Sequence, residues 1–243
     1  MNLNTHQFAF YLEEPFFKKI TQGDEIFIKD QDFLHRLIRV IKIRKDEIFI
    51  LFNFHWHMVV KFLNATRHEI KVYVLFISKN KKLQPHITFL LPLLKKDALE
   101  EAVYSLAELG VTDIHLIVTQ KSRNSLSQNE MQRLHKIIIS AAEQSKNFAF
   151  PIMHSMKNLQ EIINDLSLES DKVVFEPSGK VFLEIFKQMK FKNKILIIGP
   201  EGGLIEEELL MIKEQGFLEC SLTPTVLRSL QAAAIGTALF RMS

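Results

Sequence analysis

Cysteine is almost absent from this chain, and its scarcity excludes several kinds of protein. Cys220 is the only cysteine among 243 residues, so an internal disulfide and a thiolate cluster for zinc or iron–sulfur are both excluded. No run approaches the roughly 18 uninterrupted apolar residues of a membrane-spanning helix. The start, Met1–His6, lacks the basic end and the apolar block of a secretory signal. We therefore expect a protein of the reducing cytoplasm that contacts no membrane.

What the chain does contain is the composition of a folded protein. Hydrophobic residues make up 47% and charged residues 24%, which excludes wholesale disorder. The length suits one large domain or two small ones. Residues 1–84 hold 14 basic and 9 acidic side chains, whereas the rest of the chain holds 17 and 19. A basic N-terminal portion fits a module that reads a polyanion beside a separate reaction domain, although an ordinary soluble surface would look the same.

The N-terminal third is rich in short strand patterns. Between polar turns we expect strands over Glu25–Ile28, Glu47–Phe52, Trp56–Leu63 and Glu69–Ile77. Residues Gln31–Val40 instead repeat apolar side chains at helical spacing. Strands at short intervals around one helix predict a small β-barrel or half-barrel over residues 1–78, followed by a lysine-rich linker over residues 79–85.

From residue 86 to residue 243 the pattern alternates between strands and helices. Expected strands lie at His86–Leu91, Asp113–Val118, near Pro151, and at Lys172–Phe175, Ile195–Ile198 and Phe217–Leu222. Expected helices lie at Asp97–Leu109, from the capping box Ser127–Glu130 to about Ser145, and at Leu159–Leu166, Val181–Met189, Glu206–Gln215 and Ser229–Met242. This alternation predicts an α/β domain with a mainly parallel sheet.

Glycine is also scarce, and its few copies are concentrated. Three of the 8 glycines lie in Gly199-Pro200-Glu201-Gly202-Gly203, directly after the apolar strand Ile195–Ile198. Pro177, Pro200 and Pro224 each follow one of the last three expected strands. Ligands bind at the carboxyl ends of parallel strands. Three stiffened loops at one edge therefore predict a small-molecule pocket, although a single such loop would only turn the chain.

The expected pocket is a poor site for a polyphosphate. The chain contains neither glycine-rich nucleotide fingerprint, GxxxxGK[ST] or GxGxxG. Glu201, together with Glu206, Glu207 and Glu208 in the first turn of the next helix, would repel phosphate groups. A helix N-terminus also favours such carboxylates by itself. A neutral, zwitterionic or cationic ligand fits this loop better.

These segments resemble a known family. The run Leu196–Gly203, the segment Ser221-Leu222-Thr223-Pro224-Thr225-Val226-Leu227-Arg228 and the Ala-rich helix after it resemble the RsmE family. Its members are SPOUT-superfamily methyltransferases that methylate N3 of a uridine in 16S ribosomal RNA. Glu108–Val111 resembles the family's ELGV, Ala141–Ser145 its AAxEQS, and Arg39–Ile48 a passage of its N-terminal PUA-like, RNA-binding domain. The likeness covers most of the chain.

The resemblance implies a cofactor, a fold and partners. It implies S-adenosylmethionine held in a C-terminal trefoil knot, a homodimer, and small-subunit ribosomal RNA, free or in an assembled subunit, bound across both domains. The residues expected around the cofactor are Glu176, Ile198, Gly199, Pro200, Glu201, Gly202, Gly203, Leu222, Thr223, Pro224, Val226, Leu227 and Arg228. This cofactor is a sulfonium without a phosphate, in agreement with the acidic loop.

Arg228 is the expected catalytic residue, because it occupies the position of the arginine in the family's LRxETA segment. N3 of uracil must lose its proton before it becomes a good nucleophile, and the negative charge then spreads onto the flanking carbonyl oxygens. A fixed guanidinium nearby would stabilise that developing anion. A salt bridge within the domain, or a contact at the dimer interface, is the alternative role for this side chain.

Basic residues that would contact RNA lie in both parts of the chain. A helix and turn present Arg36, Arg39, Lys42, Arg44 and Lys45 together, with Lys121 and Arg123 as further candidates. His55 and His57 share a strand face without a neighbouring carboxylate or cysteine, so we expect no metal site. Cys220 lies inside an apolar strand and is expected to be a buried, inert thiol.

The chain departs from the family at several polar positions. The family's Arg-Thr-Glu-Thr-Ala is Arg228-Ser229-Leu230-Gln231-Ala232 here, its Gly-Arg after EQS is Lys146-Asn147, and the serine that caps the helix after GPEGG is Ile205. Two alternatives to an active methyltransferase therefore stay open. One is a diverged, non-catalytic member that grips ribosomal RNA, and the other is a different α/β enzyme that binds its ligand at Gly199–Gly203.

Overall fold

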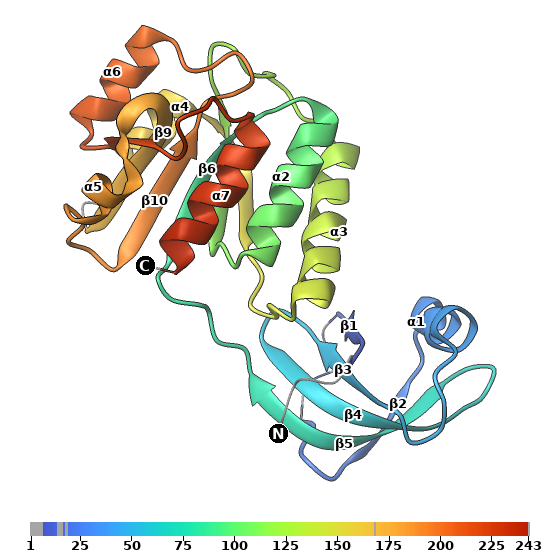
Figure 1. The fold of residues 1–243 in the computed structure, drawn as a ribbon. Coiled ribbons are helices and arrows are strands. Elements are labelled where there is room, and N and C mark those ends of the chain that lie inside the picture. Colours follow the sequence, from blue (N-terminus) through green and yellow to red (C-terminus); the bar gives the residue numbers. More distant parts are fainter. Residues whose placement is uncertain (1–6, 14–16, 18, 168, 243) are drawn as a thin grey trace. The chain divides into compact units, whose positions relative to one another are not determined.

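The computed structural model describes residues 7–13, 17, 19–167 and 169–242. The prediction about a secretory signal at Met1–His6 therefore lies outside the described residues. Contacts within the chain divide it into two compact units, Met1–Lys81 and Lys82–Ser243 (Figure 1). The boundary between the units falls inside the lysine-rich segment over residues 79–85.

The first unit is built on a five-stranded sheet in the order β1-β3-β4-β5-β2. Its strands are β1 (Ala9–Tyr11), β2 (Glu25–Ile28), β3 (Ile48–Phe52), β4 (Trp56–Ala65) and β5 (Ile70–Lys79). β1 runs parallel to β3, and the other neighbouring pairs are antiparallel. The four predicted strands are confirmed. β1 is missing from the prediction because three residues are too few for an alternating pattern to stand out.

One helical segment connects β2 with β3. α1 (Gln31–His35) continues into a π-helical turn, η1 (Arg36–Ile41), so the helix predicted over Gln31–Val40 is confirmed with wider winding at its end. The Asp30 carboxylate accepts a hydrogen bond from the backbone N–H of Phe33 at 2.8 Å and caps the helix. Phe33 and Leu37 are buried in the core of this unit, which leaves the basic side chains of the segment on the outer face.

The second unit contains a six-stranded sheet in the order β11-β9-β10-β6-β7-β8. Its strands are β6 (Ile87–Pro92), β7 (Asp113–Val118), β8 (Ile152–Asn158), β9 (Ser170–Val181), β10 (Asn193–Ile198) and β11 (Leu218–Ser221). All neighbouring pairs are parallel. This confirms the predicted α/β domain with a mainly parallel sheet.

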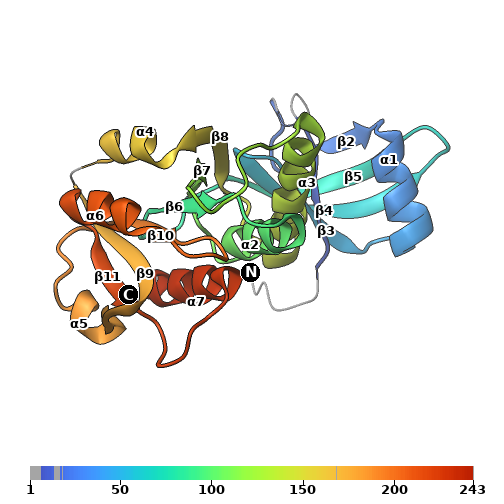
Figure 2. The ribbon, with the colours of Figure 1, turned by 90° about the horizontal axis from the view of Figure 1, so that it is seen from above.

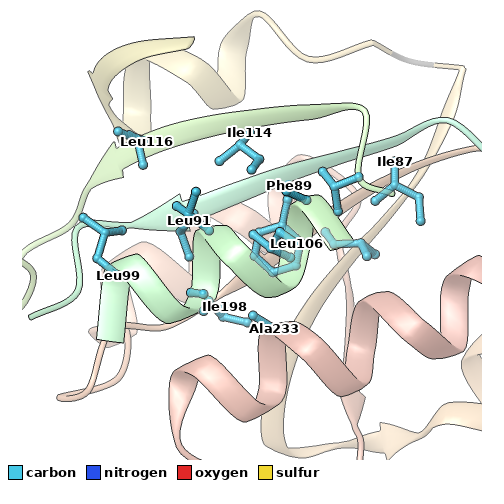
Figure 3. Packing of buried hydrophobic residues seen from close by; sticks show 14 of the residues in the cluster. Ile87, Phe89, Leu91, Leu99, Leu106, Ile114, Leu116, Ile198 and Ala233 are labelled. Carbon is cyan, nitrogen blue, oxygen red and sulfur yellow. The ribbon is translucent and has the colours of Figure 1, made fainter. Parts of the chain in front are cut away.

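Helices cover both faces of this sheet (Figure 2). They are α2 (Lys96–Glu108), α3 (Gln128–Ser145), α4 (Leu159–Asn164), α5 (Phe182–Phe186), α6 (Glu206–Glu214) and α7 (Ser229–Arg241). Phe89 and Leu91 of β6 point toward α2 and α7 (Figure 3) and share their cluster with residues of α3, whereas Leu90 joins the separate cluster beneath α4 and α6. Successive residues of a strand face opposite sides, so the near-continuous apolar runs of β6 and β10 supply both layers.

The structure corrects the expected position of Pro177. We expected this proline just past a strand that ends at Phe175, but β9 continues through it to Val181. β9 pairs with β10 only as far as Phe175, and with β11 the register jumps from Val174 to Lys180. Residues 176–179 therefore bulge out of the sheet. Gly179 allows this bulge to close, because an added Cβ would lie 2.6 Å from the backbone of Cys220.

Helix ends largely follow the predicted signals. Ser127 and Glu130 form the predicted capping box, with Ser127 Oγ accepting from the Glu130 N–H at 3.2 Å. α2 ends before Gly110, whose φ of +78° suits glycine. Ile205 is the N-cap residue of α6, and its apolar side chain makes no capping hydrogen bond, as expected. α4 and α5 are shorter than predicted. Within the described part of the chain, each helix is too short or too polar to cross a membrane.

Candidate functional site

Three segments meet at the carboxyl edge of the second unit's sheet. They are the bulge in β9, the Gly199–Gly203 loop after β10, and the segment from Leu222 to Arg228 between β11 and α7. Together with the ends of α2 and α7 they line a cavity of about 400 Å³. A smaller hollow of about 50 Å³ lies beside it, and both share Phe175, Glu176, Pro177, Leu227 and Ala232 in their walls.

The structure brings together nearly all of the residues that were predicted around a ligand. The larger cavity is lined by Glu176, Ile198, Gly199, Pro200, Glu201, Gly203, Val226, Leu227 and Arg228. Leu222 and Thr223 line the smaller hollow. Gly202 and Pro224 belong to the same loops but line neither space. Sequence reasoning missed Ala98 of α2 and Leu230 of α7, because no pattern marks an apolar helix residue as part of a pocket wall.

The tight turn after β10 explains two of its glycines. An added Cβ at Gly199 would lie 3.1 Å from the backbone nitrogen of Leu204, closer than most real side chains pack. Gly203 has a φ of +71°, a conformation that residues with a Cβ rarely adopt. The Gly203 N–H donates to the Pro200 carbonyl at 2.9 Å and closes the turn. The backbone can therefore face the cavity without a side chain in between.

Contacts from neighbouring loops hold the glycine-rich turn in place. The Glu201 carboxylate accepts a hydrogen bond from the backbone N–H of Lys95, the residue before α2, at 2.9 Å. The Lys121 ammonium donates to the Gly202 carbonyl at 3.1 Å, and its aliphatic stem lies against that glycine. Lys121 was predicted to contact RNA, and the structure shows that its ammonium already binds this loop.

Glu208 makes a third contact of this kind. The sequence analysis did not predict it, because it treated Glu208 only as one of three carboxylates in the first turn of the helix. Its side chain is buried. One carboxylate oxygen accepts the Ile205 N–H at 3.0 Å, and the other accepts the Gln120 N–H at 2.7 Å. The available signal is a glutamate at the third position of a helix, where it can bond back to the first backbone N–H. Glu208 thereby links the loop after β10 to the loop after β7.

Glu176 is a half-buried carboxyl group in the cavity wall. Burial raises the pKa of Glu176 above its usual value, the nearby Glu219 carboxylate raises it further, and Lys213 partly opposes both. A carboxylate held in a partly desolvated wall favours a ligand that supplies a positive charge or a hydrogen-bond donor.

Arg228 lies at the N-terminal end of α7 and lines the same cavity. Its Nε donates a hydrogen bond to the side-chain oxygen of Gln231 at 2.9 Å. Gln231 stands where the resembling family has a threonine, and sequence reasoning did not assign it a contact. The guanidinium is therefore held on its Nε side, and the pair lies on the exposed first turn of the helix.

The remaining predicted residues lie away from this cavity. Arg36, Arg39, Lys42, Arg44 and Lys45 are all exposed on or just after the helical segment of the first unit. Arg36 lies over the Phe10 ring, with 5.0 Å from its guanidinium carbon to the ring centre. In the second unit Arg123 forms an ion pair with Glu130 at 2.7 Å. The pKa of Glu130 is lowered to about 2, mainly by its hydrogen bond with the Ser127 backbone and then by this contact with Arg123.

The sequence predicted no reactive role for Cys220 and no metal site at His55 and His57. Cys220 is buried, and burial raises the pKa of its thiol to about 11, as expected for an inert cysteine. His57 Nδ1 lies 2.8 Å from the side-chain oxygen of Asn80. Among the described residues, no group of three or more histidine, cysteine, aspartate or glutamate side chains could hold a metal ion.

We predict that Glu208→Ala lowers the free energy of unfolding by about 1–3 kcal/mol, because it leaves two backbone N–H groups without their acceptor. Urea denaturation followed by circular dichroism measures this change, and amide hydrogen exchange should accelerate at Gln120. The matched control is Glu207→Ala, which removes an exposed carboxylate from the same turn and should change stability by less than about 0.5 kcal/mol. Equal midpoints for the two variants would contradict this role for Glu208.

Comparison with known proteins places the chain in a family. The family model for an RNA methyltransferase domain matches residues 81–241. A ribosomal RNA small subunit methyltransferase E 2 from Borreliella burgdorferi is 27% identical and covers 90% of this chain and 92% of its own. The ribosomal RNA small subunit methyltransferase E from Bacillus subtilis is also 27% identical, over 87% of this chain and 78% of its own.

Solved structures show the same fold. A ribosomal RNA small subunit methyltransferase E from Neisseria gonorrhoeae, bound to S-adenosyl methionine, matches with a TM-score of 0.84 at 22% identity. A methyltransferase from Legionella pneumophila, also in complex with that cofactor, matches with a TM-score of 0.82 at 22% identity. Each match covers 98% of both chains. On this evidence the chain belongs to the RNA methyltransferase domain family, as a member of the RsmE type.

Proposed function

We propose that this protein is an S-adenosylmethionine-dependent methyltransferase that methylates N3 of a uridine in 16S ribosomal RNA of the small subunit. One observation carries the proposal: the three strand-end segments form a single cavity, and Arg228 lies in its wall. The relatives named for small-subunit ribosomal RNA methylation support the substrate. The two matching structures with bound cofactor support the methyl donor.

The residues around the cavity fit a sulfonium cofactor. The space of about 400 Å³ lies within the usual range for small-molecule sites. Its apolar walls come from side chains such as Ile198 and Leu227, and its polar groups come from the Gly199–Gly203 backbone and Glu176. When bound, S-adenosylmethionine supplies an electrophilic methyl group. The expected cofactor set, from Glu176 through Gly199–Gly203 to Leu222–Arg228, would bind it mainly through backbone groups.

Arg228 would stabilise the reacting base. Uracil N3 attacks a methyl group only after its proton has left, and the resulting charge lies largely on the two carbonyl oxygens beside it. A guanidinium that is already in place stabilises this charge without reorganisation at the moment of reaction. The hydrogen bond to Gln231 uses the Nε of Arg228, so the terminal nitrogens of the guanidinium would contact the substrate.

A non-catalytic RNA-binding protein of the same fold is the second candidate function. The observation that favours it is the first turn of α7, where Leu230 replaces the glutamate of the resembling family and lines the cavity. An apolar side chain there cannot accept a proton or orient a polar base. Such a protein would bind the same RNA, and even the cofactor, without turnover.

Calorimetry with S-adenosylmethionine, followed by methyl mapping on undermodified small ribosomal subunits, tests both candidates. We expect binding and one methyl group at N3 of a uridine. We also expect Arg228→Ala to lower turnover by roughly 100-fold or more, the usual loss when one preorganised donor is removed. Its cofactor affinity should change little, because the cofactor would be held mainly by backbone groups.

The control for charge alone is Arg228→Lys, which keeps the positive charge but loses the planar fork and should recover only part of the rate. Absence of cofactor binding would refute the methyltransferase proposal. Binding without methyl transfer by the unaltered protein would select the non-catalytic candidate. Equal losses of turnover and affinity in Arg228→Ala would show that this residue mainly holds the cofactor or the fold.

We expect the basic face of the first unit, formed by Arg36, Arg39, Lys42, Arg44 and Lys45, to bind RNA phosphates. Replacing Arg36, Arg39 and Lys42 by glutamine should therefore reduce the dependence of RNA affinity on salt. The slope of log K against log salt should fall by about 0.7 for each lost phosphate contact on single-stranded RNA. Filter binding at several salt concentrations measures it. The control is Lys61→Gln, because the Lys61 ammonium already pairs with the Asp46 carboxylate at 3.5 Å. An unchanged salt slope in the triple variant would exclude this face as the RNA-binding surface.

The finer features of the fold are part of the same proposal. Residues 1–78 would form a PUA-like, barrel-type RNA-binding domain, and residues 86–243 the cofactor domain, with residues 79–85 between them. The last strands and α7 would form the trefoil knot typical of SPOUT proteins. In support, the chain passes from β10 beyond β9 to β11, and α7 then returns to pack against β10. A protein that modifies ribosomal RNA would work in the cytoplasm.

We also propose a homodimer formed through the C-terminal region. Several large apolar side chains there are exposed, among them Val226 at 79% and Leu183 at 66%. Light scattering coupled to size-exclusion chromatography should give twice the mass of the 28.3 kDa chain. Replacing Val226 and Leu183 by aspartate should shift the protein toward the monomer, whereas Leu210→Asp, on the exposed side of α6, should not. A monomeric unaltered protein would contradict the proposal.

A further inference from the structure

A second cavity lies at the opposite edge of the same sheet. Its volume is about 590 Å³, and it is lined where the parallel strands begin rather than where they end. His86 directly precedes β6, Asp113 opens β7, Ser170 opens β9 and Asn193 opens β10. None of these residues belongs to the cofactor cavity or to the basic face described above.

One wall of this cavity is a cluster of three histidines around Asp113. The Nε2 of His154 lies 2.8 Å from one carboxylate oxygen of Asp113, and the Nδ1 of His86 lies 3.9 Å from the other. His115 and His154 are partners on β7 and β8, and their rings stack with centres 4.0 Å apart and planes 4° from parallel. The His154 side chain still keeps 37% of its surface exposed, so this flat aromatic pair remains accessible.

The charge around the cavity is balanced. Burial, with smaller contributions from the neighbouring His154 and Lys157 and against the opposing effect of Asp113, lowers the pKa of His115 to about 4. Burial also lowers the pKa of His86, helped by Lys82 and Arg241 and opposed by Asp113. Both of these imidazoles are therefore uncharged near neutral pH. At the rim, the Lys157 ammonium lies 3.5 Å from the Asp165 carboxylate.

This combination selects one kind of ligand. An anion would meet Asp113 and Asp165, and a metal ion finds no suitable set of ligands among the described residues. A neutral imidazole offers one donor and one acceptor, an asparagine amide offers both, and a serine hydroxyl offers both. Flat rings beside mixed donors and acceptors suit an uncharged, planar, polar heterocycle. A nucleobase has these properties, and unpaired bases are commonly bound by stacking on aromatic side chains, including histidine.

We infer that the cavity lined by His86, Asp113, His154 and Asn193 binds an unpaired base of the RNA substrate, as a second recognition site on the far edge of the sheet from the methyl donor. The inference rests on the proposed RNA substrate. The base would lie against the exposed His154 ring and hydrogen-bond with the neighbouring Asp113 carboxylate. Asn193 and Ser170, which lie three and four strands away from β8 in the sheet, would contact an adjoining nucleotide, and the Lys157 side chain at the rim would lie near the connecting phosphate. The pocket would thus contribute to the choice of RNA rather than to the methyl transfer itself.

Two single variants test the pocket on the full chain. His154→Ala removes the exposed ring, and Asn193→Ala removes an exposed amide at the start of β10, three strands away, so the second remains informative if the first unfolds. The control is His135→Ala, an exposed histidine on α3 outside the cavity. Affinity for a short single-stranded RNA from the modified region is measured by fluorescence anisotropy at several salt concentrations. Calorimetry with S-adenosylmethionine accompanies each variant.

We expect His154→Ala to weaken RNA binding by roughly 5- to 150-fold, the usual effect of one lost base-stacking contact. The salt slope should not change, since no phosphate contact is lost. Asn193→Ala should weaken RNA binding in the same direction, whereas His135→Ala should bind RNA like the unaltered protein. All three variants should bind S-adenosylmethionine with unaltered affinity, because the cofactor cavity lies at the other edge.

The outcomes that overturn the inference differ from those that overturn the proposed function. If His154→Ala and Asn193→Ala bind RNA as tightly as the control, the pocket does not hold a base. A loss of affinity with a reduced salt slope would assign the site to phosphate instead. Imidazole NMR signals of His115 and His154 that move with free adenosine or uridine but not with RNA would assign it to a metabolite. If the unaltered protein binds cofactor but no RNA, the proposed substrate fails and the pocket assignment fails with it.

Discussion

The arrangement of this protein depends on how β9 pairs with its two neighbours. β9 follows β10 in parallel only to Phe175, and its register with β11 jumps from Val174 to Lys180. The residues in between are forced out of the sheet and form one wall of the cavity proposed to hold the cofactor, where Glu176 and Pro177 lie. A parallel pairing also places the ends of β9, β10 and β11 at one edge. The site thus arises from strand register and not from a separate binding domain.

Carboxylates provide the second constraint, because they accept hydrogen bonds from the protein's own backbone. Glu201 holds the start of α2, and Glu208 bonds simultaneously to the starts of α6 and of the loop after β7. Lys121 adds a cation on the Gly202 carbonyl. The loops after β6, β7 and β10 are therefore tied together by charge-assisted hydrogen bonds, which are stronger than neutral ones. This explains why an acidic glycine-rich turn can be rigid without the phosphate contacts that such turns make elsewhere.

The two edges of the sheet have different chemistry. The carboxyl edge carries exposed backbone, a carboxylate with a raised pKa and a guanidinium, which suits a cationic methyl donor and a base that becomes negative. The amino edge carries three histidines grouped around one aspartate, and burial lowers the pKa of two of them, His86 and His115. Because the same strands begin at one edge and end at the other, a change in their packing would alter both sites together. Phe175, which lines the carboxyl-edge cavity, lies against Gly236 of α7, where an added Cβ would come within 2.4 Å of the phenylalanine ring.

The amino-acid sequence by itself determined the alternation of strands and helices, the location of the helix caps at Ser127 and Gly110, and the set of strand-end residues that could line a pocket. Those features depend on local periodicity and on residues with special backbone preferences, which act over a few positions. Only the tertiary structure decided that β9 runs through Pro177, that Glu208 reaches Gln120, that Gln231 binds Arg228, and that four strand beginnings enclose a histidine cavity. The first, second and fourth of these depend on the register between segments far apart in the chain, and no local pattern encodes that register.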